Sequence, residues 1–149
     1  MSDTDTFGSL KQAEAQLESI KELVAALQWF DDNEPGDEGA VLPQIDGYDI
    51  ESQDKARERI EGDALSVQVR YGWHTPGAFV PAAGLEDFEI LLATGGPACR
   101  IIGKLDEHNE PESASIEHQD WGTPWTRLPM SGEDEGIVLT YCRQFYFGE

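Results

Sequence analysis

Residues 87–106 read DFEILLATGGPACRIIGKLD, and this stretch decides the fold. Two short apolar runs, residues 87–94 and 98–106, are joined through the tetrapeptide TGGP at residues 94–97. A Gly-Gly step tolerates the positive φ angles that tight hairpins require, so the two runs are expected to pair as antiparallel strands. Pro97 has no backbone N–H to donate, but at the start of the second run this costs the strand pairing little.

Alternating sequences on both sides extend this hairpin into a sheet. Upstream, residues 64–73 (ALSVQVRYGW) alternate between polar residues and an apolar set, namely Leu65, Val67, Val69 and Tyr71. Downstream, after a turn at residues 106–111, residues 112–120 (ESASIEHQD) alternate in the same way. A period of two is the signature of a half-buried strand, so the sequence predicts an antiparallel four-strand meander.

The N-terminal segment has the spacing of an amphipathic helix. Its apolar residues recur three or four positions apart and form one stripe, made of Leu10, Ala13, Leu17, Ile20, Val24 and Leu27. This predicts a helix over residues 9–30 that packs on the core, with Ser9 as N-cap and residues 1–8 disordered. A homodimeric coiled coil through residues 9–30 is the alternative, although sustained coiled coils have about three to four heptads with regular flanking charges.

Two further helices are expected. Ser52 precedes residues 53–63 (QDKARERIEGD), where Ala56 and Ile60 share one side of a short helix. Ser131 precedes a carboxylate-rich helix start, and the apolar spacing beyond it predicts a C-terminal helix to Tyr146, with a final strand as the competing interpretation. Residues 31–49, rich in Gly and Pro, are expected to form an acidic loop.

These elements define the expected fold class. It is α+β, an antiparallel four-strand meander with helices on one face, a long N-terminal amphipathic helix and a C-terminal helix. The length of 149 residues predicts a single domain over residues 1–149. Cys99 and Cys142 lack CxxC spacing and are expected to be buried free thiols.

The net charge restricts the kinds of partner. The chain has 30 acidic and 10 basic residues, a net charge of −20. Such a surface repels phosphate, so direct binding to nucleic acid or to an anionic membrane is disfavoured and a basic protein surface is the expected partner. The sequence shows no apolar run of about 18 residues. Its first ten residues, MSDTDTFGSL, are polar and acidic, which predicts a cytoplasmic location.

The negative charge is concentrated in two blocks. Residues 31–63, the first acidic block, contain twelve acidic and three basic residues, and residues 106–136, the second acidic block, contain nine and one. Residues 64–105 between them balance at three against three. Solvation of loops and helix faces, adaptation to high salt, and imitation of a phosphate backbone each explain this distribution at the level of sequence.

A candidate partner surface follows from these blocks. Two tryptophans in QDWGTPWT (residues 119–126) form either an exposed aromatic hook or a plug that seals one end of the sheet. The candidate residues are Asp31, Asp32, Glu34, Asp37, Glu38, Asp46, Asp49, Glu107, Glu110, Glu112, Glu133, Asp134 and Glu135, with Trp121 and Trp125 as anchors.

Motifs for catalysis or metal binding are weak. His74, His108 and His118 lack the HxxxH and HExxH spacings of metal ligands, so neither a metal nor a cofactor is expected. His118 and Asp120 are two residues apart on one predicted strand, without a GxSxG elbow. A small hydrolase-type enzyme that uses His74 or His118 with a carboxylate is therefore the alternative function.

The strings TGGPACRI, QDWGTPWT and TYCRQFYFGE resemble those of small acidic proteins of phages, prophages and plasmids. The resemblance covers the C-terminal part of the chain and implies a mobile-element setting. In that setting small acidic proteins often inhibit host defence systems, and some mimic nucleic acid. The expected function is thus an inhibitor of a host nucleic-acid-binding or defence complex, with an immunity or interaction module for a basic partner as a related alternative.

Overall fold

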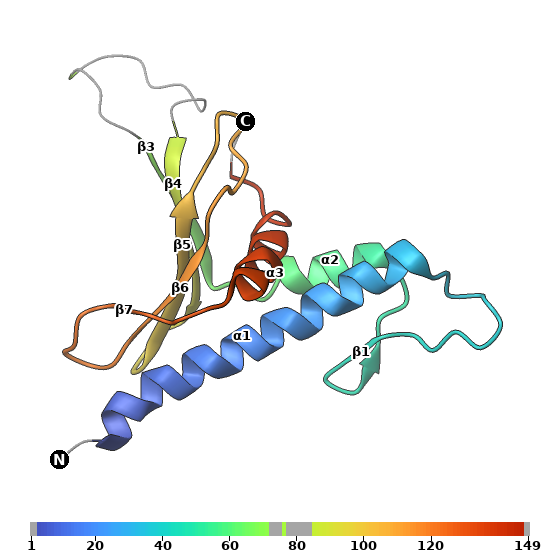
Figure 1. The fold of residues 1–149 in the computed structure, drawn as a ribbon, viewed down its shortest axis with the longest axis horizontal. Coiled ribbons are helices and arrows are strands. Elements are labelled where there is room, and N and C mark those ends of the chain that lie inside the picture. The colour runs from blue at the N-terminus through green and yellow to red at the C-terminus, as the bar shows by residue number, and fades with distance from the viewer. Residues whose placement is uncertain (1–2, 72–75, 77–84, 148–149) are drawn as a thin grey trace.

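The structure is a computed structural model that describes residues 3–71, 76 and 85–147 of the chain (Figure 1). Within these residues the chain forms three helices and two antiparallel sheets. In chain order the elements are α1 (Asp3–Asp32), β1 (Gln44–Ile45), β2 (Tyr48–Asp49), α2 (Gln53–Glu61), β3 (Ser66–Tyr71), β4 (Leu85–Ala93), β5 (Ala98–Lys104), β6 (Ser115–Gln119), β7 (Thr126–Arg127) and α3 (Gly132–Cys142). The expected α+β class is confirmed.

The main sheet is a meander of five strands in the order β3-β4-β5-β6-β7. The hairpin predicted over residues 87–106 is confirmed. β4 pairs antiparallel with β5, and Gly95 between them has a φ of 95°. The predicted count of four strands is wrong. Thr126 and Arg127 return along β6 as β7, a short strand that the sequence did not predict. Two residues are too few to show an alternating pattern.

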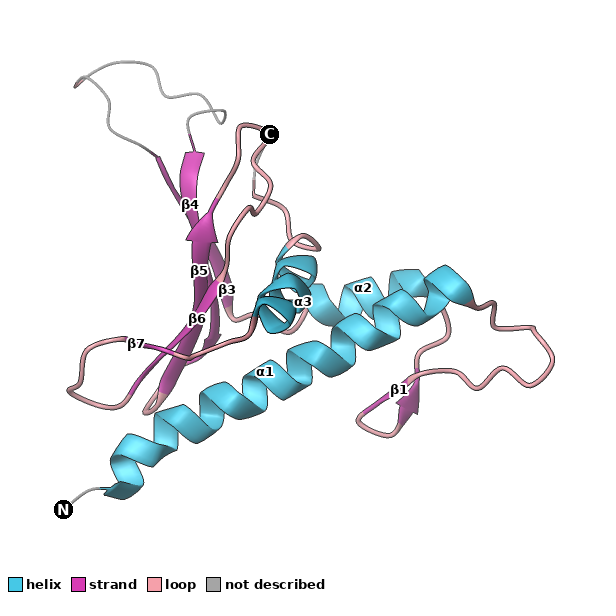
Figure 2. Cartoon of the chain, in the orientation of Figure 1, coloured by secondary structure: helices cyan, strands magenta, loops and turns pink. Residues whose placement is uncertain are grey.

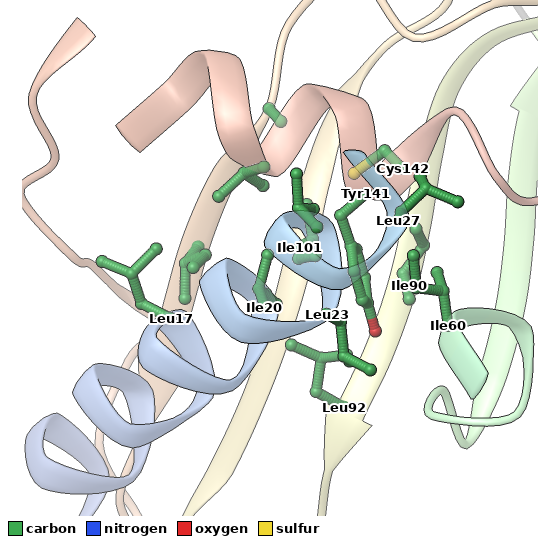
Figure 3. Packing of buried hydrophobic residues seen from close by; sticks show 14 of the residues in the cluster. Leu17, Ile20, Leu23, Leu27, Ile60, Ile90, Leu92, Ile101, Tyr141 and Cys142 are labelled. Carbon is green, nitrogen blue, oxygen red and sulfur yellow. The ribbon is translucent and has the colours of Figure 1, made fainter. Parts of the chain in front are cut away.

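All three helices lie on one face of the sheet, as expected (Figure 2). The predicted stripe of α1 is buried along Ala13, Leu17, Ile20, Val24 and Leu27. These side chains meet strand and helix residues in the core shown in Figure 3. The apolar stripe that a coiled-coil homodimer through residues 9–30 would use is therefore occupied by the chain's own core.

Several helix boundaries differ from the expected ones. α1 begins at Asp3, upstream of the predicted start, and Ser9 is a buried residue inside the helix instead of its N-cap. α3 ends at Cys142 instead of Tyr146. The chain then turns so that the Phe147 ring packs on Phe88, with 4.9 Å between ring centroids. A final strand does not form there.

The serines that precede α2 and α3 cap these helices, whereas Ser9 does not cap α1. The Ser52 hydroxyl accepts a hydrogen bond from Lys55 N at the start of α2, at 3.2 Å. The Ser131 hydroxyl accepts one from Asp134 N at the start of α3, at 3.1 Å. Each serine satisfies one of the free N–H groups in a first helical turn, which is why both helices begin where the sequence predicts.

The acidic segment 31–49 contains a small hairpin that the sequence analysis did not predict. β1 and β2 pair through Asp46 and Gly47, both of which have positive φ angles, 53° and 82°. An Asp-Gly pair in this conformation forms a type I′ turn. Buried Ile45 and Ile50 attach the hairpin to the core. The dense charge and the Gly and Pro residues of this segment concealed the turn.

The environment of β3 also differs from the prediction. The strand forms where expected, but every residue of it is exposed instead of half-buried. Leu65, Val67 and Val69 remain 59%, 37% and 38% exposed. Among the described residues the strand lies at the edge of the sheet, paired with β4 only, and the helices leave it exposed.

Candidate functional site

The first acidic block forms one exposed region at the end of α1. Asp31 and Asp32 close the helix, and the chain then leads through an outward excursion to the β1–β2 hairpin and α2 (Figure 1). Its candidate carboxylates are all exposed, namely Asp31, Asp32, Glu34, Asp37, Glu38, Asp46 and Asp49. The structure thus places seven of the predicted surface residues in one region.

Few of these carboxylates are neutralised. Asp46 pairs with Arg59 at 2.7 Å, while Asp31 and Asp49 accept hydrogen bonds from glutamine side chains at 3.0 and 2.7 Å. The side chains of Asp32, Glu34 and Glu38 make no ion pair or hydrogen bond with any described residue. Their charges are therefore free to act on a partner.

The position of Asp31 and Asp32 is unfavourable for the helix that carries them. The C-terminal end of a helix carries a partial negative charge, and α1 has no basic residue in its last turn. A carboxylate at this end destabilises a helix by roughly 0.3–1 kcal/mol at low ionic strength. The helix dipole therefore does not explain these two acidic residues, and Asp32 has no other described contact that does.

The second acidic block is arranged differently, and Asp106 is its first example. The Asp106 carboxylate accepts hydrogen bonds from the backbone N–H groups of Glu110 and His108, at 3.0 and 2.8 Å. These bonds hold the pKa of Asp106 below its usual value. The charge of Asp106 thus shapes the turn between β5 and β6.

The acidic start of α3 also has a structural role. Glu133, Asp134 and Glu135 lie in its first turn, where the helix dipole favours negative charge. Asp134 also pairs with Lys21 of α1 at 3.0 Å. The hydrogen bond between Lys21 and Asp134 is the main reason that the pKa of Lys21 is raised. The pair joins α3 to α1.

Glu117 belongs to an ion-pair network on the outer face of the sheet. Arg100 contacts Glu89 and Glu117, each at 2.7 Å, and its guanidinium lies 4.1 Å from the ring centre of Trp125. Trp125 is therefore packed on a cation. Trp121 is 88% exposed, so the interpretation as a plug is wrong for this residue, and a hook of two exposed tryptophans does not form because Trp125 packs on Arg100.

A buried polar cluster joins the first turns of α1 to β6. The Ser9 hydroxyl lies 2.9 Å from His118 Nδ1 and donates to Asp120 Oδ2 at 2.8 Å, and Ser9 N donates to Asp120 Oδ1 at 3.0 Å. Because the serine hydrogen points to Asp120, the hydroxyl oxygen accepts a hydrogen bond from His118 Nδ1. All three residues are more than nine-tenths buried.

This cluster brings Ser, His and Asp together without the geometry of a nucleophile. A catalytic serine gives its proton to histidine and faces a substrate, whereas Ser9 is committed to Asp120 inside the fold. Surface hollows of about 510 and 350 Å³ are lined by other residues. The cluster thus fastens α1 to the sheet. His74 lies outside the described residues.

Other reactive groups in the described residues are shielded. Cys99 and Cys142 are confirmed as buried free thiols, and burial raises the pKa of Cys99 to about 12 and also raises that of Cys142. A protonated thiol is a poor nucleophile and metal ligand. Among the residues that the structure describes, no group of three or more His, Cys, Asp or Glu side chains could hold a metal ion.

The turn at residues 106–111 in the second block lies away from the segment that follows α1 (Figure 1). The turn at residues 106–111 lies near the C-terminus, where Arg143 donates to the Pro111 carbonyl at 3.3 Å. Figure 1 shows the segment that follows α1, which includes residues 33–43 of the first block, on the far side of α3 from this turn. The predicted surface residues Glu107, Glu110 and Glu112 are thus separated from those of the first block.

Comparison of the chain with protein-family models, with curated proteins and with solved structures gave no match. In the described residues, no helix combines the length and the apolar character needed to cross a membrane. Any functional assignment therefore rests on the physical chemistry of the site itself.

Proposed function

We propose that this protein is a non-catalytic acidic inhibitor, encoded by a mobile element and active in the cytoplasm. It binds the basic surface of a host nucleic-acid-binding or defence complex through the first acidic block. One observation carries the proposal. Asp32, Glu34 and Glu38 are exposed and lack partners among the described residues, and Asp32 lies at a helix end where negative charge is unfavourable.

Charge density suits this block to compete with nucleic acid. Residues 31–38 hold five carboxylates in a short exposed segment, which are Asp31, Asp32, Glu34, Asp37 and Glu38. A groove lined by Lys and Arg that normally binds phosphates would be attracted to such a segment. Association steered by charge is fast and weakens steeply as salt is added.

The remaining predicted surface residues have a secondary part in this proposal. Glu107, Glu110 and Glu112 add to the long-range field that steers encounter, because they lie away from the contact region. Exposed Trp121 is a second anchor, since tryptophan is enriched at interaction hot spots. The Trp125 ring packs on the Arg100 guanidinium, so in this proposal Trp125 shapes the outer face of the sheet and is not an anchor.

The test compares two variants of equal charge change. The first carries Asp31→Asn, Asp32→Asn, Glu34→Gln, Asp37→Asn and Glu38→Gln. The control carries Glu107→Gln, Glu110→Gln, Glu112→Gln, Glu133→Gln and Glu135→Gln. Partners are captured from host lysate with the unchanged protein, identified by mass spectrometry and then measured with each variant at low and high salt.

The expected partner is basic, binds nucleic acid and is displaced by double-stranded DNA. The first variant should weaken its affinity at least about tenfold, corresponding to about 1.4 kcal/mol. The control should change the affinity by only about twofold, because its charges act at a distance. Equal losses in both variants, a neutral partner, or an affinity that does not depend on salt would overturn the proposal.

A further inference from the structure

Strand β3 forms an open edge of the main sheet in the described part of the chain. It pairs with β4 on one side and has no described strand on the other. Natural edge strands usually carry charges or proline that prevent pairing with another chain. The sequence SVQVRY of β3 holds a single charged residue, Arg70, and its Nε already donates to Asp87 at 2.9 Å. The edge is therefore poorly protected.

The side of β3 that faces the helices is apolar and uncovered. Val67 pairs with Ile90 and Val69 pairs with Phe88, so these four side chains point to the same face of the sheet. Ile90 and Phe88 are buried under the helices, whereas Val67 and Val69 remain more than one-third exposed. Leu65, at 59% exposure, continues the same apolar row. A further strand beside β3 would extend the core over this row.

The distribution of charge selects a second copy of this chain as that neighbour. Two chains of net charge −20 repel each other wherever their acidic blocks approach. Residues 64–105, which contain β3 and β4, balance at three acidic and three basic residues. Contact through β3 is thus a contact between neutral regions of two strongly acidic molecules.

The sequence of β3 is complementary to itself in an antiparallel arrangement. With a two-fold axis at Gln68, Val67 of one copy lies opposite Val69 of the other, and Leu65 lies opposite Tyr71. All of these residues project to one face, because side chains alternate along a strand. Such an isologous contact is the commonest way in which soluble proteins form dimers.

We propose that two copies of this protein pair through β3, antiparallel and centred on Gln68, to form one continuous sheet. The dimer joins the apolar rows of the two β3 strands, and the negative charges of its two chains repel each other. Added salt screens that repulsion and strengthens the dimer. Binding of a basic partner by the first acidic block weakens with salt, so failure of one proposal is distinguishable from failure of the other.

The first experiment measures mass by sedimentation equilibrium over a range of protein and salt concentrations. We expect a dimer whose dissociation constant falls as salt rises. Val67→Lys with Val69→Lys should give a monomer, because four lysines would meet at the two-fold axis. Val41→Lys, which also replaces an exposed valine, should leave the dimer unchanged. Circular dichroism verifies that both variants remain folded.

The second experiment tests the register. In the proposed dimer the two copies of Gln68 lie opposite each other with Cβ atoms about 5 Å apart. Gln68→Cys should therefore form a disulfide-linked dimer under mild oxidation. Ser66→Cys should not, because an offset of four residues separates its two copies by about 13 Å. The native thiols stay silent, since Cys99 and Cys142 are fully buried.

The outcomes decide the proposal. A salt-strengthened dimer with selective cross-linking of Gln68→Cys supports it. A monomer at all concentrations overturns it, and so does a dimer that survives the double lysine substitution. Equal cross-linking of the two cysteine variants indicates a parallel or nonspecific contact and overturns the antiparallel register. Stoichiometric binding of an unrelated extended peptide to β3 in a monomeric protein would assign the edge to a different partner.

Discussion

The two acidic blocks carry nearly the same net charge, −9 and −8, and both contain engaged carboxylates, but residues 31–38 differ from the carboxylates around β6 in their contacts. In the second block, Asp106, Glu117 and Asp120 accept hydrogen bonds that shape a turn, hold an arginine and fasten a helix. In the first block, Asp32, Glu34 and Glu38 have no such partner among the described residues. An excess of charge therefore does not by itself mark an interaction surface, and the proposed surface rests on carboxylates that lack a structural role.

The helix ends show the same difference. α3 begins with three acidic residues at the end of the helix where the dipole favours them. α1 ends with Asp31 and Asp32 at the end where the dipole opposes them. Changes of one carboxylate in each block should thus have unequal and, at the helix ends, opposite effects on stability.

The largest difference is expected at Asp120. Asp120→Ala removes the acceptor of two buried donors, Ser9 N and the Ser9 hydroxyl. Buried donors without partners are expensive, so the free energy of unfolding should fall by about 3 kcal/mol. Asp32→Ala in the first block should change it by less than about 0.5 kcal/mol. Urea denaturation measures both, and similar losses would contradict the division between the blocks.

A smaller loss of stability is expected when Arg100 of β5, which pairs with Glu117 of β6, is replaced. Arg100→Met keeps most of the side-chain volume but leaves Glu89 and Glu117, both partly buried, without their cation. We expect a loss of about 1–2 kcal/mol. Arg59→Met breaks the exposed pair with Asp46 in the first block, and such pairs contribute less than about 1 kcal/mol. Thermal unfolding should show a lower midpoint for the Arg100 variant alone.

Much of the fold could be predicted because its signals are local. The stripe of α1, the Gly-Gly hairpin and the helix starts after Ser52 and Ser131 depend on residues close together in the sequence, and all are confirmed, whereas the predicted cap at Ser9 is not. The type I′ turn at Asp46-Gly47 is just as local. It was overlooked because the surrounding charge and breakers favoured a loop.

The site could be predicted only in part. The sequence located the acidic blocks, but it could not separate carboxylates with partners from those without. Ser9 and Asp120 are 111 positions apart, and no periodic pattern links residues at that distance. Similarly, the alternation in β3 predicted an apolar face correctly, but coverage of that face depends on where the helices pack in three dimensions.

The pH dependence of stability tests the charge of Asp106 itself. Asp106→Asn keeps an acceptor oxygen for the two backbone N–H groups but removes the charge. Because folding lowers the pKa of Asp106, the carboxylate stabilises the fold above the unfolded value near 3.8 and loses this effect as pH falls through the folded pKa. The variant should be less stable than the original protein at neutral pH, by less than the Arg100 variant.

Urea denaturation at neutral pH and at strongly acidic pH checks this expectation. The difference between Asp106→Asn and the original protein should shrink at acidic pH, where both carry a neutral side chain. A difference that stays constant would show that hydrogen-bond geometry, and not charge, determines the role of Asp106.

The smallest change should also have the opposite sign. Asp32→Lys places a positive charge at the C-terminal end of α1, where the dipole favours it, and removes a carboxylate without a described partner. The free energy of unfolding should rise by about 0.5 kcal/mol at low salt, and this gain should fade as salt screens the charges. Glu133→Lys makes the same change of charge in the first turn of α3 and should lower stability by a similar amount. If both variants moved in the same direction, net charge would govern stability instead of position, and the carboxylates of the first block would no longer stand out as charges that the fold does not need.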